Sequence, residues 1–241
     1  MLQISISRLP ELFAAMAEKR ALYMPVRKND QVNFAPWTAE TTYCGDVLKT
    51  VKSAKDLFFP QSETIAHFKR EGKQLSVDPA APADENFIIF GVRACDAASF
   101  EILDKVFLSE PADQHYKARR EHGLVITMAC AEPEESCFCQ VFGIDATEPG
   151  GDISCWTAED TLYWKANTEK GRQLTEELSG ILSEGASDAV EAQKAAVREL
   201  IPQLPLSDLN LDGFNGDALQ EKFDSPKWKE LSEACLGCGA C

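Results

Sequence analysis

The sequence predicts an α/β fold in which a mainly parallel sheet is flanked by helices. Residues 87–92 and 124–128 form two short, continuous apolar runs, as is typical of strands that are buried on both faces. Between them, residues 97–108 carry apolar side chains at helical spacing, with Asp96 placed to cap the helix. A strand, a helix and a second strand form a parallel crossover, so we expect both strands to end at the same edge of the sheet.

The residues before this crossover predict further scaffold. Residues 8–19 carry an apolar stripe at helical spacing, and residues 21–25 have the character of a short strand. Residues 62–68 begin with Ser62, a good helix cap, and predict a third helix. Residues 78–84 are polar and rich in proline, which indicates a loop.

The second half of the chain predicts helices that cover the sheet, and then a change of domain. Residues 168–182 and 187–200 are rich in strong helix formers. We expect three parts, which are an α/β domain over residues 1–203, a connector over 204–224, and the beginning of a cysteine-bearing module over 225–241. That module starts with a serine and a proline, a favourable beginning for a helix.

Charge and composition exclude several classes of protein. The 241 residues include 24 basic and 39 acidic side chains, a formal charge of −15 that repels nucleic acid and anionic lipid. No apolar stretch is long enough to cross a bilayer, and the N-terminus lacks the pattern of a signal peptide. Nine cysteines in a chain that we expect in the cytoplasm indicate metal or redox chemistry rather than disulfides.

The C-terminal tail carries the most specific motif. Cys235, Cys238 and Cys241 have the spacing with which a ferredoxin loop supplies three thiolates to a [4Fe-4S] cluster. Gly237 and Gly239 lie between them and allow the backbone to fold close to the sulfur atoms. A zinc knuckle is the alternative, although zinc sites more often pair two separate hooks of cysteines. Because no fourth cysteine follows, we expect the chain to end inside a truncated ferredoxin-like module.

Four further cysteines predict a second site at the edge of the sheet. Cys95 and Cys130 follow the two buried strands, where open α/β sheets usually bind their ligands. Cys137 and Cys139 follow a few residues later and are placed to close around the same point. The four thiolates predict a metal site that holds an iron–sulfur cluster or zinc. Nearby Arg93 is a candidate to bind a cluster sulfur, to contact a partner, or to form a structural ion pair.

The remaining reactive side chains form no motif of their own. The sequence has no glycine-rich dinucleotide fingerprint and no phosphate-binding loop. The histidines, His67, His115 and His122, stand apart from one another among charged or polar residues, which indicates surface positions. Cys155 is a possible substitute ligand for the second site, and Cys44 is expected to be structural or a free thiol.

In these residues the chain resembles a known family, the iron–sulfur beta subunits of soluble sulfhydrogenase-type nickel–iron hydrogenases, which are similar to one of the subunits of anaerobic sulfite reductase. Four blocks carry the resemblance: residues 55–61 with Glu63, residues 91–96, residues 130–139 and residues 228–241. The cysteine blocks are the most distinctive part of it. Two departures from the family pattern, Ala94 and the segment 140–143, remove no ligand.

The resemblance implies an electron relay in a cytoplasmic hetero-oligomer of anaerobic metabolism. In it the chain passes electrons between a flavin- and NAD(P)-binding subunit and a catalytic redox subunit, and has no catalytic residues of its own. The family also carries a two-cluster ferredoxin domain that would continue beyond Cys241. Two alternatives remain, namely a zinc-stabilised scaffold subunit without redox activity and an oxidoreductase with its own substrate. The latter predicts a cluster iron without a cysteine ligand, whereas the second site offers four.

Overall fold

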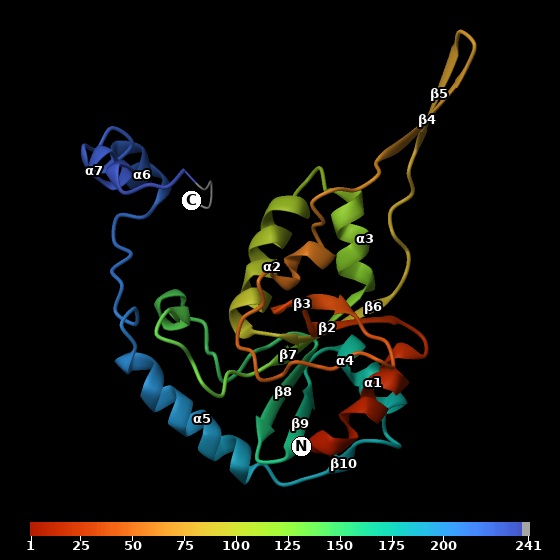
Figure 1. Ribbon diagram of the computed structural model, residues 1–241, viewed down its shortest axis with the longest axis vertical. Coiled ribbons are helices and arrows are strands. Elements are labelled where there is room, and N and C mark those ends of the chain that lie inside the picture. Colours follow the sequence, from red (N-terminus) through yellow and green to blue (C-terminus); the bar gives the residue numbers. More distant parts are fainter. Residues whose placement is uncertain (238–241) are drawn as a thin grey trace. The chain divides into compact units, whose positions relative to one another are not determined.

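The structure, a computed structural model, describes residues 1–237 and divides the chain into two compact units, Met1–Ser207 and Asp208–Cys241. The first unit contains an eight-stranded sheet and a separate ribbon of two strands (Figure 1). In spatial order the strands of the sheet are β10 (Ser183–Glu184), β1 (Leu2–Ser5), β9 (Thr161–Ala166), β8 (Ile153–Ala158), β7 (Gly123–Met128), β6 (Phe87–Val92), β2 (Ala21–Lys28) and β3 (Gln31–Pro36). The ribbon consists of β4 (Ala66–Glu71) and β5 (Gln74–Pro79).

The centre of the sheet is parallel and its two sides are antiparallel. Strands β8, β7, β6 and β2 run parallel to one another. Strand β3 pairs antiparallel with β2 on one side, and β9, β1 and β10 add antiparallel pairs on the other. The prediction of an α/β fold is therefore confirmed. The sheet is mixed because short hairpin connections join β2 to β3 and β8 to β9, and such connections produce antiparallel pairs.

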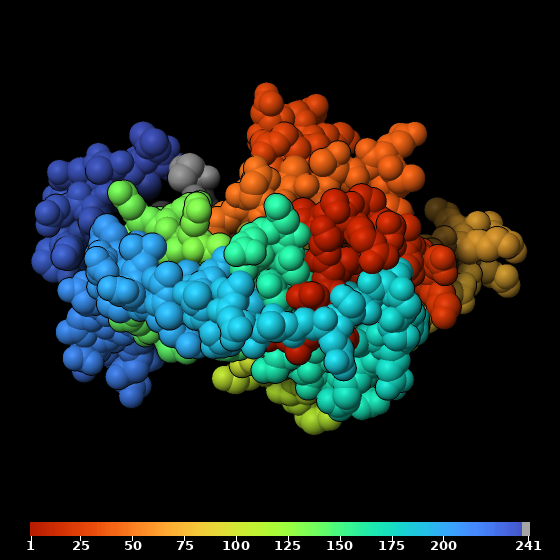
Figure 2. Space-filling model, turned by 90° about the horizontal axis from the view of Figure 1, so that it is seen from below, coloured from red at the N-terminus to blue at the C-terminus, as the bar shows by residue number. Residues whose placement is uncertain are grey.

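Helices cover both faces of the sheet. The helices of the first unit are α1 (Leu9–Ala17), α2 (Ala94–Phe107), α3 (Gln114–His122), α4 (Glu169–Glu177) and α5 (Asp188–Leu200), with short 3-10 turns η1 (Ile6–Arg8), η2 (Ala54–Leu57), η3 (Cys139–Phe142) and η4 (Ile201–Gln203). Apolar residues of α1 and α4 share one core cluster with Ile88 and Ile126. On the other face, Phe100 of α2 packs with Phe58, Phe87 and Ile89. Helix α5 packs through Val190 on a third cluster around Trp156 of β8, and lies across the face of the molecule seen in Figure 2.

The predicted helix over residues 62–68 is wrong, because this segment leads into strand β4. The side chains that suggested a helical stripe are exposed, so no core packing selects a helix there. Helix α2 begins at Ala94, with Arg93 in the cap position, so the prediction that Asp96 caps it is also wrong. Helix α3 was not predicted, because its sequence is polar and only Tyr116 is buried.

A salt bridge fastens the end of α4 to the turn between α1 and β2. The Glu177 carboxylate accepts hydrogen bonds from both terminal nitrogens of Arg20, at 3.0 and 2.8 Å. These bonds lower the pKa of Glu177 from 4.5 to about 2. Because the folded state favours the charged carboxylate, its stabilising effect is complete above about pH 4.5 and is lost as the pH falls toward about 2.

We therefore expect the Glu177→Gln variant to be less stable than the parent chain at neutral pH by up to about 1 kcal/mol, since the pair is partly exposed. The difference should shrink at about pH 3. Urea unfolding at both pH values measures it, with Glu176→Gln as the matched control. An equal loss at both pH values would show that the salt bridge is not responsible.

The second unit contains two short helices, α6 (Gly216–Glu221) and α7 (Lys227–Glu233), with no buried residues. Helix α6 lies within the segment that was predicted to be a connector. Helix α7 follows Pro226 and thus begins close to the predicted start. Within residues 1–237 no helix has both the length and the apolar character that a membrane span requires.

Candidate metal centre

Cys95 and Cys130 lie at the edge of the sheet where β6 and β7 end. The register places Val92, the last residue of β6, beside Thr127 of β7. Cys95 follows in the first turn of α2, and Cys130 stands two residues beyond β7. The parallel crossover therefore positions both thiols at one edge, as the sequence predicts. The N-terminal N–H groups of a helix favour a thiolate at the position of Cys95.

The other two cysteines lie on a loop that is closed at its base. The N–H of Cys130 donates to the carbonyl of Ala146 at 3.0 Å, so the chain leaves and returns at one place. In the loop, the N–H of Cys137 donates to the carbonyl of Glu134, whose own N–H donates to the Cys137 sulfur at 3.3 Å. Cys139 is the first residue of η3. Gly143 follows η3 and adopts the left-handed conformation, with φ of 69°.

Three of the thiols, those of Cys95, Cys130 and Cys139, have pKa values that depend on neighbouring cysteines. Hydrogen bonding with Cys139 lowers the pKa of Cys95 to about 7, against the opposing effect of burial. The same bond, together with burial, raises the pKa of Cys139 far above its ordinary value. Burial raises the pKa of Cys130 to about 11, and the charges of Cys95 and Cys137 act in the same direction. The loop therefore brings the Cys139 thiol to Cys95 and places Cys137 where its charge acts on Cys130.

Arg93 holds the two strand ends and a neighbouring loop together. Its guanidinium donates to the carbonyl of Ala129 at 2.9 Å and to the carbonyl of Val47 at 3.1 Å. The positive charge also opposes part of the rise that burial causes in the pKa of Cys130. Among the roles that the sequence left open for Arg93, the structure shows bonds to backbone carbonyls rather than an ion pair with a carboxylate of residues 1–237.

Lys49 fixes the cysteine loop from outside. Its ammonium group lies 2.6 Å from a carboxylate oxygen of Glu134 and 2.5 Å from the hydroxyl oxygen of Ser136. Ser136 immediately precedes Cys137, and Glu134 lies three residues before it. Sequence reasoning missed this contact, because Lys49 lies 85 residues before Glu134 and nothing in the local pattern marks it.

The segment of residues 55–61 that carries the family resemblance supports the start of α2. Asp96, next to Cys95, accepts hydrogen bonds from the hydroxyl of Ser53 at 2.7 Å and from the ammonium group of Lys55 at 3.3 Å. Phe58 is fully buried, and the guanidinium of Arg120 lies 4.8 Å from the centre of its ring. These contacts give the segment a structural role in holding the helix on which Cys95 stands.

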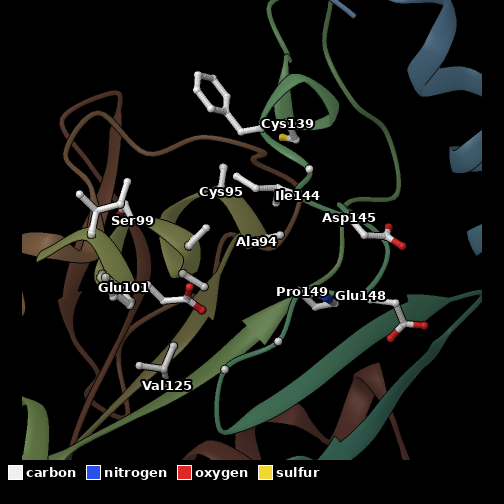
Figure 3. Close-up of a pocket in the computed structure, with 18 of the residues that line it drawn as sticks. Ala94, Cys95, Ser99, Glu101, Val125, Cys139, Ile144, Asp145, Glu148 and Pro149 are labelled. Carbon is white, nitrogen blue, oxygen red and sulfur yellow. The ribbon is translucent and has the colours of Figure 1, made fainter. Parts of the chain in front are cut away.

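A cleft of about 1010 Å³ opens beside the cysteines. Three of them, Cys95, Cys137 and Cys139, line it, whereas Cys130 is buried and does not belong to the lining. Figure 3 shows Cys95 and Glu101 on α2, with Cys139 and Asp145 on the opposite loop. The exposed rings of Phe138 and Phe142, in edge contact at 5.8 Å between their centres, belong to the same lining.

Four thiols are a donor set that both iron–sulfur clusters and zinc accept. Nowhere in residues 1–237 do three Cys, His, Asp or Glu side chains stand in an arrangement that could hold a metal ion. A tetrahedral zinc site with bonds of about 2.3 Å would bring its sulfurs within about 3.8 Å of each other. In a [4Fe-4S] cluster each thiolate binds a different iron, so the ligands stand further apart. Cys95 and Cys139 are close enough for a hydrogen bond between their thiols, so the structure shows neither arrangement complete, and ligation by the four cysteines stays a prediction.

The remaining predicted residues lie elsewhere. Cys235 is exposed in the second unit, where Gly237, at φ of 66°, donates its N–H to the Cys235 sulfur at 3.4 Å. Its partners in the motif, Cys238 and Cys241, lie outside the part of the chain that the structure describes. Cys155 is fully buried in the core cluster with Met128, where burial raises its pKa well above the ordinary value, so it is not placed to replace a ligand.

Cys44 is buried, and its N–H donates to the carbonyl of Pro25, which agrees with a structural role. The three histidines are separate from the cysteine site. His67 is exposed on β4, His115 lies 3.6 Å from a Glu63 oxygen, and His122 hydrogen-bonds Asn86.

Comparison with characterised proteins identifies one similar chain by name. The beta subunit of sulfhydrogenase 2 from Pyrococcus furiosus is 30% identical over 232 residues, which make up 96% of the present chain and 67% of that protein. No family model matches the sequence, and no solved structure matches it.

Proposed function

The chain belongs to the sulfhydrogenase beta-subunit family, and we propose that it is an iron–sulfur electron-transfer subunit of a multisubunit oxidoreductase. It would relay electrons between a flavin- and NAD(P)-binding subunit and a catalytic subunit of the hydrogenase or sulfite-reductase type, in the cytoplasm. The observation that carries the proposal is the placement of four thiols at one edge of the sheet: Cys95 and Cys130 follow the parallel strands β6 and β7, and Cys137 and Cys139 lie on the loop that the Cys130–Ala146 hydrogen bond closes.

These four residues would hold one [4Fe-4S] cluster. When bound, such a cluster accepts and returns single electrons at a potential that its surroundings determine. The chain contributes those surroundings. Cys130 is buried, Arg93 brings a positive charge near it, and the closed loop fixes Cys137 and Cys139. Burial and charge near a cluster are the means by which a protein adjusts its potential.

We also propose that the tail belongs to a ferredoxin-like module with Cys235, Cys238 and Cys241 as ligands. In this proposal the chain consists of an α/β domain (residues 1–203), a connector (204–224) and the ferredoxin-like module (225–241). The Gly237 N–H that donates to the Cys235 sulfur supports this proposal, because ferredoxin loops direct backbone N–H groups at sulfur in the same way. Cluster ligation in the first unit and in the tail would give the chain more than one redox centre.

Anaerobic purification of the intact complex tests the function. We expect a brown protein whose absorbance bleaches when reduced nicotinamide is added through the flavin subunit. The clusters of this chain should then give the paramagnetic signal of a reduced [4Fe-4S] centre. A colourless chain that contains zinc and no iron would instead support the scaffold function and contradict the proposal.

A further inference from the structure

The ribbon of β4 and β5 has no strand beside it. The two strands pair antiparallel with each other, with Phe68 opposite Val77, and within residues 1–237 neither pairs with a strand of the large sheet. All residues of both strands are exposed except Ala66, which is half-buried. Figure 1 shows the ribbon extending away from the helices of the first unit.

The ribbon has one apolar face and one polar face, because alternate residues of a strand point to opposite sides. The apolar face consists of Ala66, Phe68, Leu75, Val77 and Pro79, with Arg70 near the turn. The polar face consists of His67, Lys69, Glu71, Gln74, Ser76 and Asp78. On the apolar face, Phe68 is 73% exposed, Leu75 65% and Val77 51%.

An exposed apolar face on an isolated ribbon indicates that another molecule covers it. A two-stranded hairpin is at best marginally stable in water without a surface to pack on. Contiguous exposed apolar residues commonly mark an interaction site. Packing within residues 1–237 does not supply such a surface, because these side chains are exposed there.

The charge of the ribbon differs from that of the chain. Residues 69–73, around the turn, contain Lys69, Arg70 and Lys73 but only one acidic residue, Glu71, whereas the whole chain carries −15. At physiological salt a charge acts over about 8 Å, so a partner at the turn meets a basic surface. Carboxylates on the partner would complement it.

We propose that the ribbon docks on a neighbouring subunit of the same oxidoreductase, with its apolar face in an apolar groove that carboxylates border. The inference rests on the proposed hetero-oligomer and not on the cluster. Burial of Phe68, Leu75 and Val77 would supply the attraction, and the basic turn would select the orientation.

Two matched double variants test the docking. Phe68→Ser with Val77→Ser removes a cross-strand pair from the apolar face, and His67→Ser with Asp78→Ser removes the neighbouring pair from the polar face. In the complex assembled from purified subunits, the first is expected to weaken binding of this chain about tenfold or more. The second should leave binding unchanged. Native mass spectrometry over a dilution series measures both, and the circular dichroism and thermal unfolding of each variant show that the first unit still folds.

Carbodiimide cross-linking of the intact complex identifies the partner. It joins a lysine to a carboxylate in direct contact, and we expect Lys73 to be joined to an Asp or Glu of a different subunit. A cross-link to this chain or to a second copy of it, or equal binding of the two double variants, would overturn the inference.

Three further outcomes separate the proposed docking from lipid binding, from the absence of a complex, and from assembly through another surface. If the chain pellets with phosphatidylserine vesicles only when Phe68 and Val77 are present, and assembly does not depend on them, the ribbon binds lipid and the inference fails. If the purified chain assembles with no other subunit, the proposed hetero-oligomer fails as well. Assembly that is independent of the ribbon would overturn the docking alone.

Discussion

Replacement of Cys130 by serine is expected to remove one cluster from the chain. The thiol is buried, a serine hydroxyl would be a poor ligand for iron, and Cys155, the possible substitute ligand, lies in the core. Because metal binding contributes directly to folding free energy, the loop over residues 130–146 should also become more accessible to protease. Iron and sulfide analysis after anaerobic purification, together with limited proteolysis, measures the effect.

The same loss is expected for Cys95→Ser, Cys137→Ser and Cys139→Ser. Cys44→Ser is the matched control, because Cys44 is also buried in the first unit but outside the site. It should keep the full complement of iron. If the four ligand variants keep their iron as well, the assignment of Cys95, Cys130, Cys137 and Cys139 is wrong.

Arg93→Ala is expected to have the second largest effect. The change removes two hydrogen bonds from a charged donor to the carbonyls of Ala129 and Val47. Each such bond contributes about 1.5–3 kcal/mol, so we expect a loss of about 3 kcal/mol or more in the free energy of unfolding. The positive charge near Cys130 disappears too, and the cluster potential should fall.

Arg93→Lys separates the two effects, because lysine keeps the charge but lacks the fork that reaches two carbonyls. It should restore most of the potential and only part of the stability. Chemical denaturation and a redox titration measure the two quantities. Arg27→Ala, at an exposed position of β2, is the control and should change neither. An unaltered potential in Arg93→Ala would contradict the proposed influence on the site.

The sequence predicted those elements whose signals are local. The runs that became β6 and β7 are continuous and apolar, and both strands are buried throughout. Thr168 stands at the start of a predicted helix and accepts a hydrogen bond from the N–H of Gly171, so it caps α4. From these elements alone, Cys95 and Cys130 could be placed at one edge of the sheet.

What the sequence could not predict depends on contacts between distant residues. In residues 62–68 the apolar positions also fit a strand, and over so short a segment periodicity does not separate a helix from a ribbon. The hydrogen bonds of Arg93 join residues that are 36 and 46 positions away. The contact of Lys49 with the cysteine loop spans a still longer stretch of chain, so only the folded sheet brings these groups together.

The most direct test of the account is the iron content of a chain in which Cys235, Cys238 and Cys241 are all replaced by serine. In a polypeptide of residues 1–241 the tail then has no thiolate left, so a cluster bound by these residues must be held by the first unit. We predict a brown protein with about four irons and four sulfides per chain. A colourless protein without iron would contradict the central claim that Cys95, Cys130, Cys137 and Cys139 hold a cluster at the edge of the sheet.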